Sequence, residues 1–501
     1  MTLSFDKATP VIVVFAVMAL ETFAIFANGA YFPSAMTLCV VGVWTLLVTM
    51  LFVNRNEMLS NITRGRLLLL GLTVAFWAWV GLSLFWSISA DQTWTDFNRT
   101  GGYLAVLLLG VVLGNNSAVR SWVVLLFVGV VTSAAAYGSG PRILPAVIDN
   151  LEDASRIAVP MGYANATGLL MALAYPLSLY IASSRRYNPS VRIFMVVSTL
   201  ILGICLFFTA SRGATLALAI GLLIYFAASP LRLRSFGVFI LTFSPTILIA
   251  LWASDQDAMV KNKVDISLRL AAAAELRLYL GFSILLVTLI FIVALFAGKR
   301  IRFSKFVTRI TGGVALVSVI SGMFMAIALF VSAQPSLGGW ARQAYHDFTV
   351  GAPSQTAGAG RLIVLSSSGR WPLWREAMAN WEDNPVNGTG AQSFPVVHLM
   401  RREGDVVFVK QAHGLGFSLL AELGLVGFLL MGAFIAMSLT YAALLVCRLR
   451  DRWDKGLAAA MVSLIVIYLI HSSYDWDWNM FALTLPYFFF TGILLGWRRY
   501  R

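Results

Sequence analysis

Long apolar runs separated by short polar stretches form the dominant pattern along the chain. The runs are about 17–25 residues long, the length that an α-helix needs to cross the hydrocarbon core of a bilayer. We therefore predict an all-α fold, a polytopic transmembrane bundle of about fourteen helices. The candidate spans lie at residues 10–27, 31–53, 67–88, 102–114, 121–138, 160–182, 193–209, 213–229, 236–253, 280–298, 310–333, 425–447, 457–470 and 481–497.

The longest polar segment, residues 334–412, is too long to be an idle connection within a compact domain. Within it, Pro372 suits the first turn of a helix, and Trp374, Met378 and Trp381 then recur at helical spacing. This stripe predicts a short amphipathic helix at the membrane interface, where tryptophan is favoured. The helix would either anchor the segment to the membrane or form a platform that stacks on sugar rings or closes over a lipid carrier.

Composition and charge support the membrane prediction. The chain is 59% hydrophobic and only 12% charged, whereas soluble domains carry about 25% charged residues. The net charge of +14 could indicate a nucleic-acid partner. However, Lys and Arg are concentrated in the loops and tails that lie inside if the N-terminus is cytoplasmic. Clusters such as Arg185–Arg186 and Arg498–Arg501 therefore act as topology signals and contact anionic lipids. We expect a multi-pass plasma (inner) membrane protein with both termini cytoplasmic and no nucleic-acid partner.

Arg212 is the most informative charged residue, because charges at membrane depth are costly and mark functional sites. It lies in the stretch 208–214, which joins two spans with almost no loop on the outer side. A guanidinium can form paired hydrogen bonds with phosphate oxygens. Ser211 and the start of the next helix add further donors, which together predict an anion site. Alternatively, Arg212 extends to the lipid headgroups as an anchor.

A second cation on the same side would make a diphosphate the natural ligand. Arg370 opens the predicted amphipathic helix, and by itself it would be an ordinary exposed arginine. Beside Arg212 it gains meaning, because two fixed cations can balance the charge of a diphosphate. Lys410 and Arg361 are weaker candidates of the same kind.

His413 stands where the long outer segment re-enters the membrane. A single histidine at a membrane mouth suits a proton acceptor that works near neutral pH, although it could also be a polar cap at the interface. The other histidines are His346, His398 and His471, and no zinc-type spacing links the four. We therefore predict no metal and no cofactor.

Further polar groups accompany these candidates. Asp475 and Asp477 follow the next-to-last span on the outer side. They could hold a divalent cation with a diphosphate, but we favour a polar hairpin between two spans. Asn165 lies at a helix entrance, and we keep Asn165, Asp475 and Trp374 as substrate-binding candidates. Glu422 follows His413 by nine residues, which is two and a half turns of an α-helix. The two side chains would therefore face opposite ways unless the helix breaks.

Four pieces of the sequence together resemble the O-antigen ligase and polymerase family of bacterial membrane glycosyltransferases. They occur in order across roughly 160–430, and the Asp-Trp-Asp-Trp stretch at 475–478 is also similar to some members from Gram-positive lineages. The four pieces are Gly-Tyr-Ala-Asn-Ala-Thr-Gly at 162–168, Thr-Ala-Ser-Arg-Gly-Ala at 209–214, Gly-Arg-Trp-Pro-Leu-Trp at 369–374, and His413 followed by Leu-Leu-Ala-Glu-Leu-Gly-Leu-Val-Gly at 419–427.

The resemblance implies transfer of a glycan from a polyprenyl (undecaprenyl) diphosphate carrier on the outer face, without a metal. It also implies about twelve spans, so the bundle is expected to have about 12–14. Arginines that match Arg212 and Arg370 hold the diphosphate in such proteins, and the histidine that matches His413 acts on the acceptor hydroxyl. The chain departs from the family at Gly414, where an Asn or Ser is usual.

The chemistry of the residues agrees with this function. A diphosphate leaves readily once its charge is balanced, so only the acceptor needs a base and a single displacement inverts the anomeric centre. We expect residues 1–501 to form one integral-membrane domain, with 334–412 as an extracytoplasmic loop that forms part of the active site. The acceptor is a lipid or a glycan, and both a ligase and a polymerase fit. The alternative is a lipid-linked oligosaccharide flippase or another transporter, which would need charges along a path through the membrane.

Overall fold

The computed structural model describes residues 5–53, 64–148, 155–300, 337–350, 367–402 and 408–498. The described residues form helices and connecting turns and contain no strand, so the all-α prediction is confirmed. Ten of the described helices are long and apolar enough to cross a membrane, and Arg212–Ala228 and Phe481–Gly496 are shorter apolar helices. The bundle consists of α1 (Phe5–Phe26), α2 (Pro33–Val53), α4 (Arg64–Leu82), α5 (Ala90–Leu113), α6 (Ser117–Ile143), α7 (Ala164–Ser183), α8 (Pro189–Thr209), α9 (Arg212–Ala228), α10 (Arg232–Ser254), α12 (Ile266–Arg300), α17 (Leu415–Arg448), α18 (Arg452–Ser472) and α19 (Phe481–Gly496).

Several predicted boundaries need correction. The span predicted at 102–114 is the second half of α5, which begins at Ala90 and carries Asp96 and Arg99. Both charged side chains are buried, and Arg99 Nη1 donates to Asp96 Oδ1 at 2.7 Å. Hydropathy alone misses such a start, because the pairing that makes the charges tolerable in the helix is not visible in a sequence average.

The outer segments are also more helical than expected. Residues 254–279, which lie between two predicted spans, contain the short helix α11 (Asp257–Val260) and the start of α12. The span predicted at 425–447 begins earlier, at Leu415. The span predicted at 310–333 lies outside the described residues.

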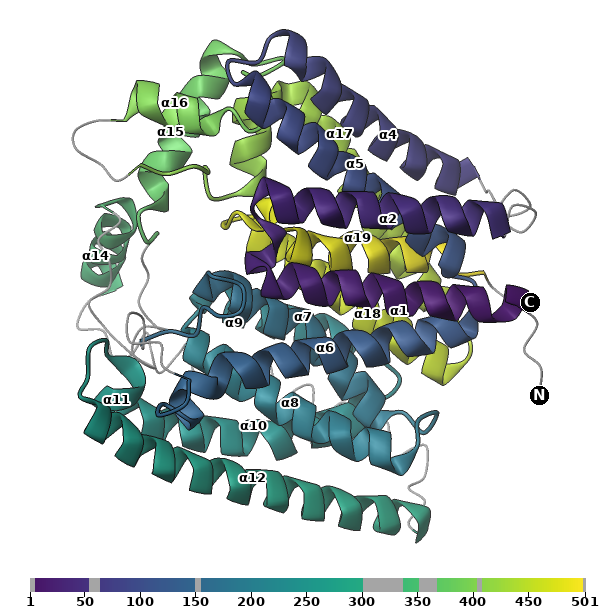
Figure 1. Cartoon of the computed structure of the whole chain (residues 1–501), viewed down its shortest axis with the longest axis vertical. Coiled ribbons are helices and arrows are strands. Elements are labelled where there is room, and N and C mark those ends of the chain that lie inside the picture. Colours follow the sequence, from purple (N-terminus) through teal and green to yellow (C-terminus); the bar gives the residue numbers. More distant parts are fainter. Residues whose placement is uncertain are drawn as a thin grey trace.

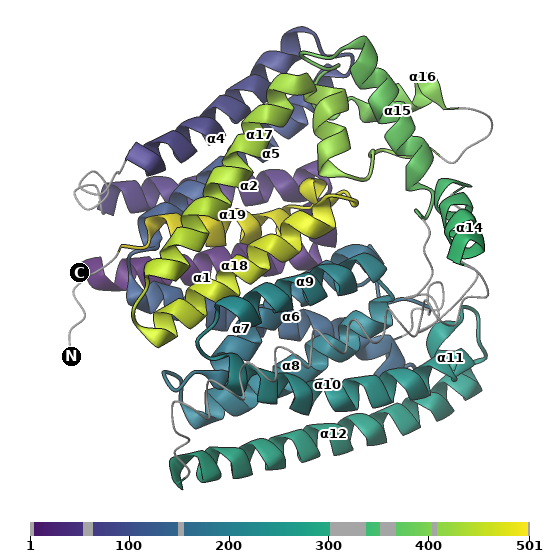
Figure 2. The same ribbon diagram turned by 180° about the vertical axis from the view of Figure 1, so that it is seen from behind.

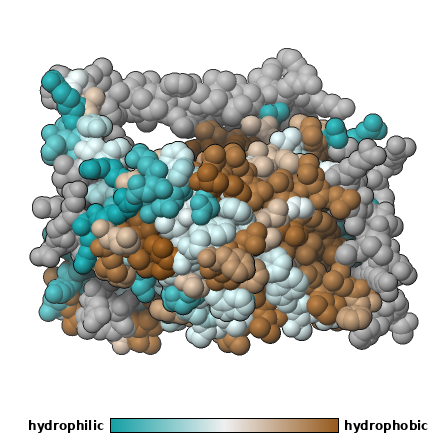
Figure 3. Space-filling view, turned by 90° about the horizontal axis from the view of Figure 1, so that it is seen from above, coloured by the Kyte–Doolittle hydropathy of each residue, from teal (hydrophilic) through white to brown (hydrophobic). Residues whose placement is uncertain are grey.

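Helix α7 forms the centre of one half of the bundle, and its most apolar stretch is completely buried. It packs against α6, α8, α9 and α18. Helix α12 lies at the edge of the bundle in Figures 1 and 2, and Leu278, Phe282 and Leu285 on it are exposed. Figure 3 shows a hydrophobic surface across the middle of the molecule and a hydrophilic surface toward the end where α15 and α16 lie. A band of this kind suits contact with lipid chains.

Three short helices stand at one end of the bundle, α14 (Leu337–Val350), α15 (Arg370–Asp383) and α16 (Phe394–Arg401). Figure 1 shows them at the end opposite the start of α1 and the end of α19. The predicted amphipathic helix is α15, but its buried face consists of Leu373, Ala377 and Asn380. The predicted stripe, with Trp374 and Trp381, is only half-buried. The predicted helix is therefore present, and the face that packs inside the protein is a different one from the tryptophan stripe, whose expected place at the membrane interface stays a prediction.

The segment between α15 and α16 packs against a bend in α17 and is hydrogen-bonded to it. Gly424 has φ 64° and interrupts the helix, and the freed N–H of Leu425 donates to the carbonyl of Pro385 at 2.9 Å. A Cβ on Gly424 would lie 2.3 Å from the carbonyl carbon of Val386. Non-helical backbone at membrane depth needs such internal partners. The Glu422 carboxylate accepts from the N–H groups of Gln392 and Phe394 on the same segment.

Candidate active site

Asp475 is the centre of the site, in the loop that follows α18. Its side chain is 1% exposed. Arg370 Nη2 and Asn165 Nδ2 each donate to Asp475 Oδ2 at 2.8 Å. His413 Nδ1 lies 3.5 Å from Oδ1, and the Tyr163 hydroxyl lies 3.3 Å from both oxygens. The structure thus brings together four candidates that are far apart in the sequence.

The electrostatic environment favours the charged forms of Asp475 and Arg370. Burial raises the pKa of Asp475, but His413, Arg370 and His471 outweigh burial and hold the pKa of this carboxyl well below its ordinary value. Burial lowers the pKa of Arg370, and Asp475 and Tyr163 outweigh it, so that the pKa of Arg370 is raised. The two side chains therefore form a buried, fully ionised pair at neutral pH.

Arg370 keeps hydrogen-bonding capacity beyond this pair. Its Nε is buried and has no hydrogen-bond partner among the described residues, and the same is true of the neighbouring Ser367 hydroxyl. A buried donor without a partner costs free energy. The arrangement is therefore suited to a ligand that accepts hydrogen bonds at this position.

The position of His413 depends on the backbone around it. His413 has φ 54°, and Gly414, the N-cap of α17, has φ 152°. The His413 carbonyl accepts from Trp374 Nε1 at 2.6 Å, and the Trp374 ring stacks on Phe417 at 4.9 Å. A Cβ on Gly414 would lie 2.9 Å from the carbonyl oxygen of Ser473. This close approach explains why glycine follows the histidine in this chain.

The imidazole itself lies near the carboxylate without a hydrogen bond to it. Its side chain is 18% exposed, and Nδ1 is buried without a hydrogen-bond partner, since 3.5 Å to Asp475 exceeds a good hydrogen bond. The ring meets the edge of Trp476 at 6.4 Å between centroids. A small rotation would bring Nδ1 into hydrogen-bonding distance of the carboxylate.

Arg212 joins the site through the turn between α8 and α9. Ala210 has φ 48° and reverses the chain, and the buried Ser211 hydroxyl accepts from the N–H of Ala214 as the N-cap of α9. Arg212 Nη2 donates to the Ser368 hydroxyl at 2.6 Å. Because Ser368 is two residues before Arg370, both arginines border the same short segment.

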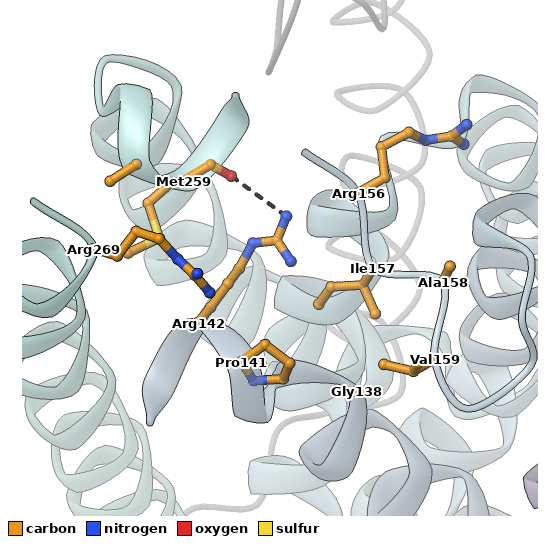
Figure 4. Close-up of a pocket in the computed structure, with 10 residues that line it drawn as sticks. Gly138, Pro141, Arg142, Arg156, Ile157, Ala158, Val159, Met259 and Arg269 are labelled. Carbon is orange, nitrogen blue, oxygen red and sulfur yellow. Dashed lines mark hydrogen bonds between the residues drawn. The ribbon is translucent and has the colours of Figure 1, made fainter. Parts of the chain in front are cut away.

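Arg156 belongs to the same network, and sequence reasoning missed it. Its Nη2 donates to Asn165 Oδ1 at 2.6 Å and its Nε to the carbonyl of Thr209 at 2.8 Å. It also lines a pocket with Arg142 and Arg269, which lie on the opposite side of that pocket in Figure 4. No local signal marks Arg156, because it is one arginine in a polar outer segment.

The comparison with known families agrees with the resemblance seen in the sequence. Residues 270–432 match the family model described as O-antigen ligase. This match supports membership of the O-antigen ligase family. The match spans about a third of the chain and includes Arg370, His413 and Glu422, whereas Arg212 and Asp475 lie outside it. No curated protein matches the chain.

The match supports a membrane glycan-ligase or polymerase type of function. The many apolar helices make the chain a multi-pass membrane protein.

The remaining site candidates differ in how closely they approach the network around Asp475. Lys410 is exposed, and Arg361 lies outside the described residues. Asn165 contacts Asp475 directly, as described above, and Trp374 contacts the backbone of His413.

The histidines and the two aspartates have separate partners. Asp477 pairs with the buried His471 at 2.7 Å, and burial raises the pKa of Asp477 although His471 opposes it. His398 pairs with Glu376 at 2.6 Å, and His346 is exposed. Across the described ranges no three His, Cys, Asp or Glu side chains are grouped to hold a metal ion. Asp475 and Asp477 thus belong to different ion pairs.

Proposed function

We propose that the protein transfers a glycan from a polyprenyl (undecaprenyl) diphosphate donor to a hydroxyl of a lipid or glycan acceptor on the extracytoplasmic face. The observation that carries this proposal is that Arg370 and His413 lie beside the buried carboxylate of Asp475, while Arg212 donates to Ser368, two residues before Arg370. Ligase and polymerase share this chemistry, and they differ in the acceptor that is presented.

The two arginines bind the donor diphosphate. They border the segment 367–370 from two sides, and the unpartnered Nε of Arg370 supplies a donor for a phosphate oxygen. Fixed cations stabilise the charge that develops when the bond between the anomeric carbon and the phosphate oxygen breaks. The leaving diphosphate then needs no acid catalyst. Asp475 already pairs with Arg370, and Asp477 with His471.

His413 accepts the proton of the acceptor hydroxyl as its oxygen attacks the anomeric carbon. Asp475 faces Nδ1 and therefore favours the proton on that nitrogen, which leaves Nε2 as the acceptor. The carboxylate then stabilises the imidazolium that forms. A single displacement of this kind inverts the anomeric configuration.

The remaining candidates act through these three residues. Asn165 orients Asp475, and Trp374 fixes the backbone of His413. Ser211 orients Arg212 by capping α9. Lys410 would attract the donor only at long range, since it is exposed and outside the network.

The flippase alternative receives less support. A flippase needs polar groups along a path through the membrane, whereas Arg370, His413 and Asp475 lie at the end of the bundle that carries α14, α15 and α16. We place this end outside and both termini in the cytoplasm, following the distribution of Lys and Arg.

The test uses the purified full-length protein in nanodiscs, with a polyprenyl-diphosphate-linked glycan as donor and EDTA present. His413→Ala should abolish transfer and retain donor binding, while Arg212→Ala and Arg370→Ala should weaken donor binding. Arg375→Ala is the matched control, because Arg375 is an exposed arginine on the same helix α15. Transfer that survives all three site substitutions, or that EDTA stops in the wild type, would refute the assignment.

A further inference from the structure

A second group of cations lies at the other end of the helices that build the site. Helix α7 runs from Ala164 to Ser183, and α18 runs from Arg452 to Ser472. Helices of about 20 residues are about 30 Å long. Arg452 is therefore about one bilayer thickness from the catalytic end of α18. In the proposed topology this is the cytoplasmic end.

Three arginines from three helices meet here, and we call them the arginine cluster: Arg192 of α8, Arg234 of α10 and Arg452 of α18. The guanidinium groups of Arg234 and Arg452 lie over the ring of Trp453, at 5.8 and 4.8 Å from its centroid. Arg192 Nε donates to the carbonyl of Ala182 at 2.8 Å, which directs this side chain toward the end of α7. The Arg192 guanidinium also lies over the ring of Phe291 on α12, at 5.6 Å from its centroid. Aromatic contacts therefore hold all three cations in place.

Among the described residues, no carboxylate forms an ion pair with the arginine cluster. Arg186 takes the nearby carboxylates, since it pairs with Asp451 at 2.8 Å and also with Asp454. Within the described part of the chain, no member of the arginine cluster forms an ion pair with an acidic side chain. Arg234 Nη1 is buried and has no hydrogen-bond partner there.

Neighbouring arginines repel Arg234 electrostatically. The charges of Arg185, Arg452 and Arg192 are close enough to Arg234 to repel it. Positive charges brought together in this way, with a buried donor left open, are stabilised by an anion that accepts from several guanidinium groups. A phosphate fits this requirement, because its oxygens match the planar fork of arginine.

The surroundings point to a phosphate that carries acyl chains. After Arg234 in the sequence, helix α10 exposes Ile240, Phe243 and Ile247, which recur at helical spacing along one surface of the helix. Acyl chains can lie along this apolar stripe while the headgroup stays at the helix end. Anionic lipids are abundant in the cytoplasmic leaflet, and basic pockets between helices recognise their headgroups.

We propose that the arginine cluster binds the phosphate of an anionic phospholipid at the end of the bundle opposite the catalytic site. The site is independent of the glycan chemistry, because it contains none of the residues assigned to transfer. Its occupant would supply the negative charge that the described residues around Arg234 do not.

The test measures lipid binding to the full-length protein in detergent by native mass spectrometry, with phosphatidylglycerol and phosphatidylethanolamine as probes. The wild type should retain one phosphatidylglycerol in preference to phosphatidylethanolamine. Arg234→Gln and Arg452→Gln should each weaken its binding about five-fold, and the double substitution about 25-fold. Arg448→Gln is the charge-matched control, since Arg448 is exposed at the end of α17 on the same side.

Two further arms separate lipid from free anion and from misfolding. Inorganic phosphate in excess should not displace phosphatidylglycerol, whereas equal displacement would identify an adventitious ion only. Arg234→Lys, which keeps the charge but loses the fork, should bind better than Arg234→Gln. Equal weakening by Arg448→Gln, or no preference over phosphatidylethanolamine, would overturn the proposal. Glycan transfer should persist in these variants, so failure of either proposal can be told from failure of the other.

Discussion

The two ends of the bundle differ in whether their positively charged side chains have carboxylate partners among the described residues. At the catalytic end, Arg370 and His413 share the carboxylate of Asp475, which is 1% exposed. At the other end, Arg234 and Arg452 lie over Trp453, and neither pairs with a carboxylate in the part of the chain that the structure describes. Charge is thus balanced internally at the proposed catalytic end, whereas the described residues leave it unbalanced at the other end, where we propose that a membrane lipid supplies the counter-charge.

The physical reason lies in what each end must do. A transferase needs its cations and its base held in place before the substrate arrives, because preorganised charge lowers the barrier without reorganisation. A buried pair also costs desolvation, which hydrogen bonds from Asn165 and Tyr163 to Asp475 help to offset. A lipid site has no such demand, since its ligand remains at high local concentration in the bilayer.

The largest expected effect comes from removing the shared carboxylate. Asp475→Ala leaves Arg370 and His413 without their common partner, and breaking a buried pair costs about 3–5 kcal/mol. We expect kcat/KM for glycan transfer to fall about 10²–10³-fold. Asp454→Asn at the other end, which breaks only a partly exposed contact to Arg186, should leave kcat/KM unchanged. Equal losses in the two variants would contradict the comparison.

The bend in α17 is expected to have the next largest effect, because it docks the segment that follows α15, the helix on which Arg370 lies. Gly424→Ala places a Cβ 2.3 Å from the Val386 carbonyl carbon at a φ of 64°, which should cost about 1–3 kcal/mol. The thermal midpoint and the transfer rate should both fall. Gly432→Ala on the same helix meets nothing within 4 Å and is the control. An unchanged midpoint for Gly424→Ala would show that the segment docks without the bend.

Replacing the forked cations by point charges should have a moderate effect. Arg212→Lys and Arg370→Lys keep the charge but lose paired hydrogen bonds to phosphate, so KM for the donor should rise about ten-fold. Arg375→Lys on the exposed side of α15 should have no effect on KM. A fall in kcat alone, with donor binding intact, would indicate that these arginines contact the acceptor instead.

The smallest effect is expected from pH in the neutral range. The pKa of Asp475 is lowered in the folded protein, so its contribution to stability is complete above the ordinary value of about 4. It is lost only as the pH falls further, toward the lowered pKa. The difference in thermal midpoint between wild type and Asp475→Asn should therefore stay constant from about pH 8 to 5 and shrink below about pH 4. A difference that already shrinks near pH 6 would contradict an ionised Asp475–Arg370 pair.

The sequence by itself determined the fold class and most of the helices. A bilayer admits only segments that satisfy their own backbone, so apolar runs of sufficient length become helices with few alternatives. The local motifs also indicated Arg212, Arg370 and His413, because charged and titratable groups are rare beside apolar spans. Their proposed roles remain predictions that the variants above will test.

Only the tertiary structure decided which of these groups share a partner. Asp475, expected in a hairpin, is the point where residues from α7, α15 and the start of α17 meet. Arg156 joins that network, and Asp96 pairs with Arg99 inside α5, without any local signal. These contacts link residues that are close in space, and a pattern along one chain reports only what is periodic or adjacent. The balance of charge at each end of the bundle therefore appears only once the helices are packed.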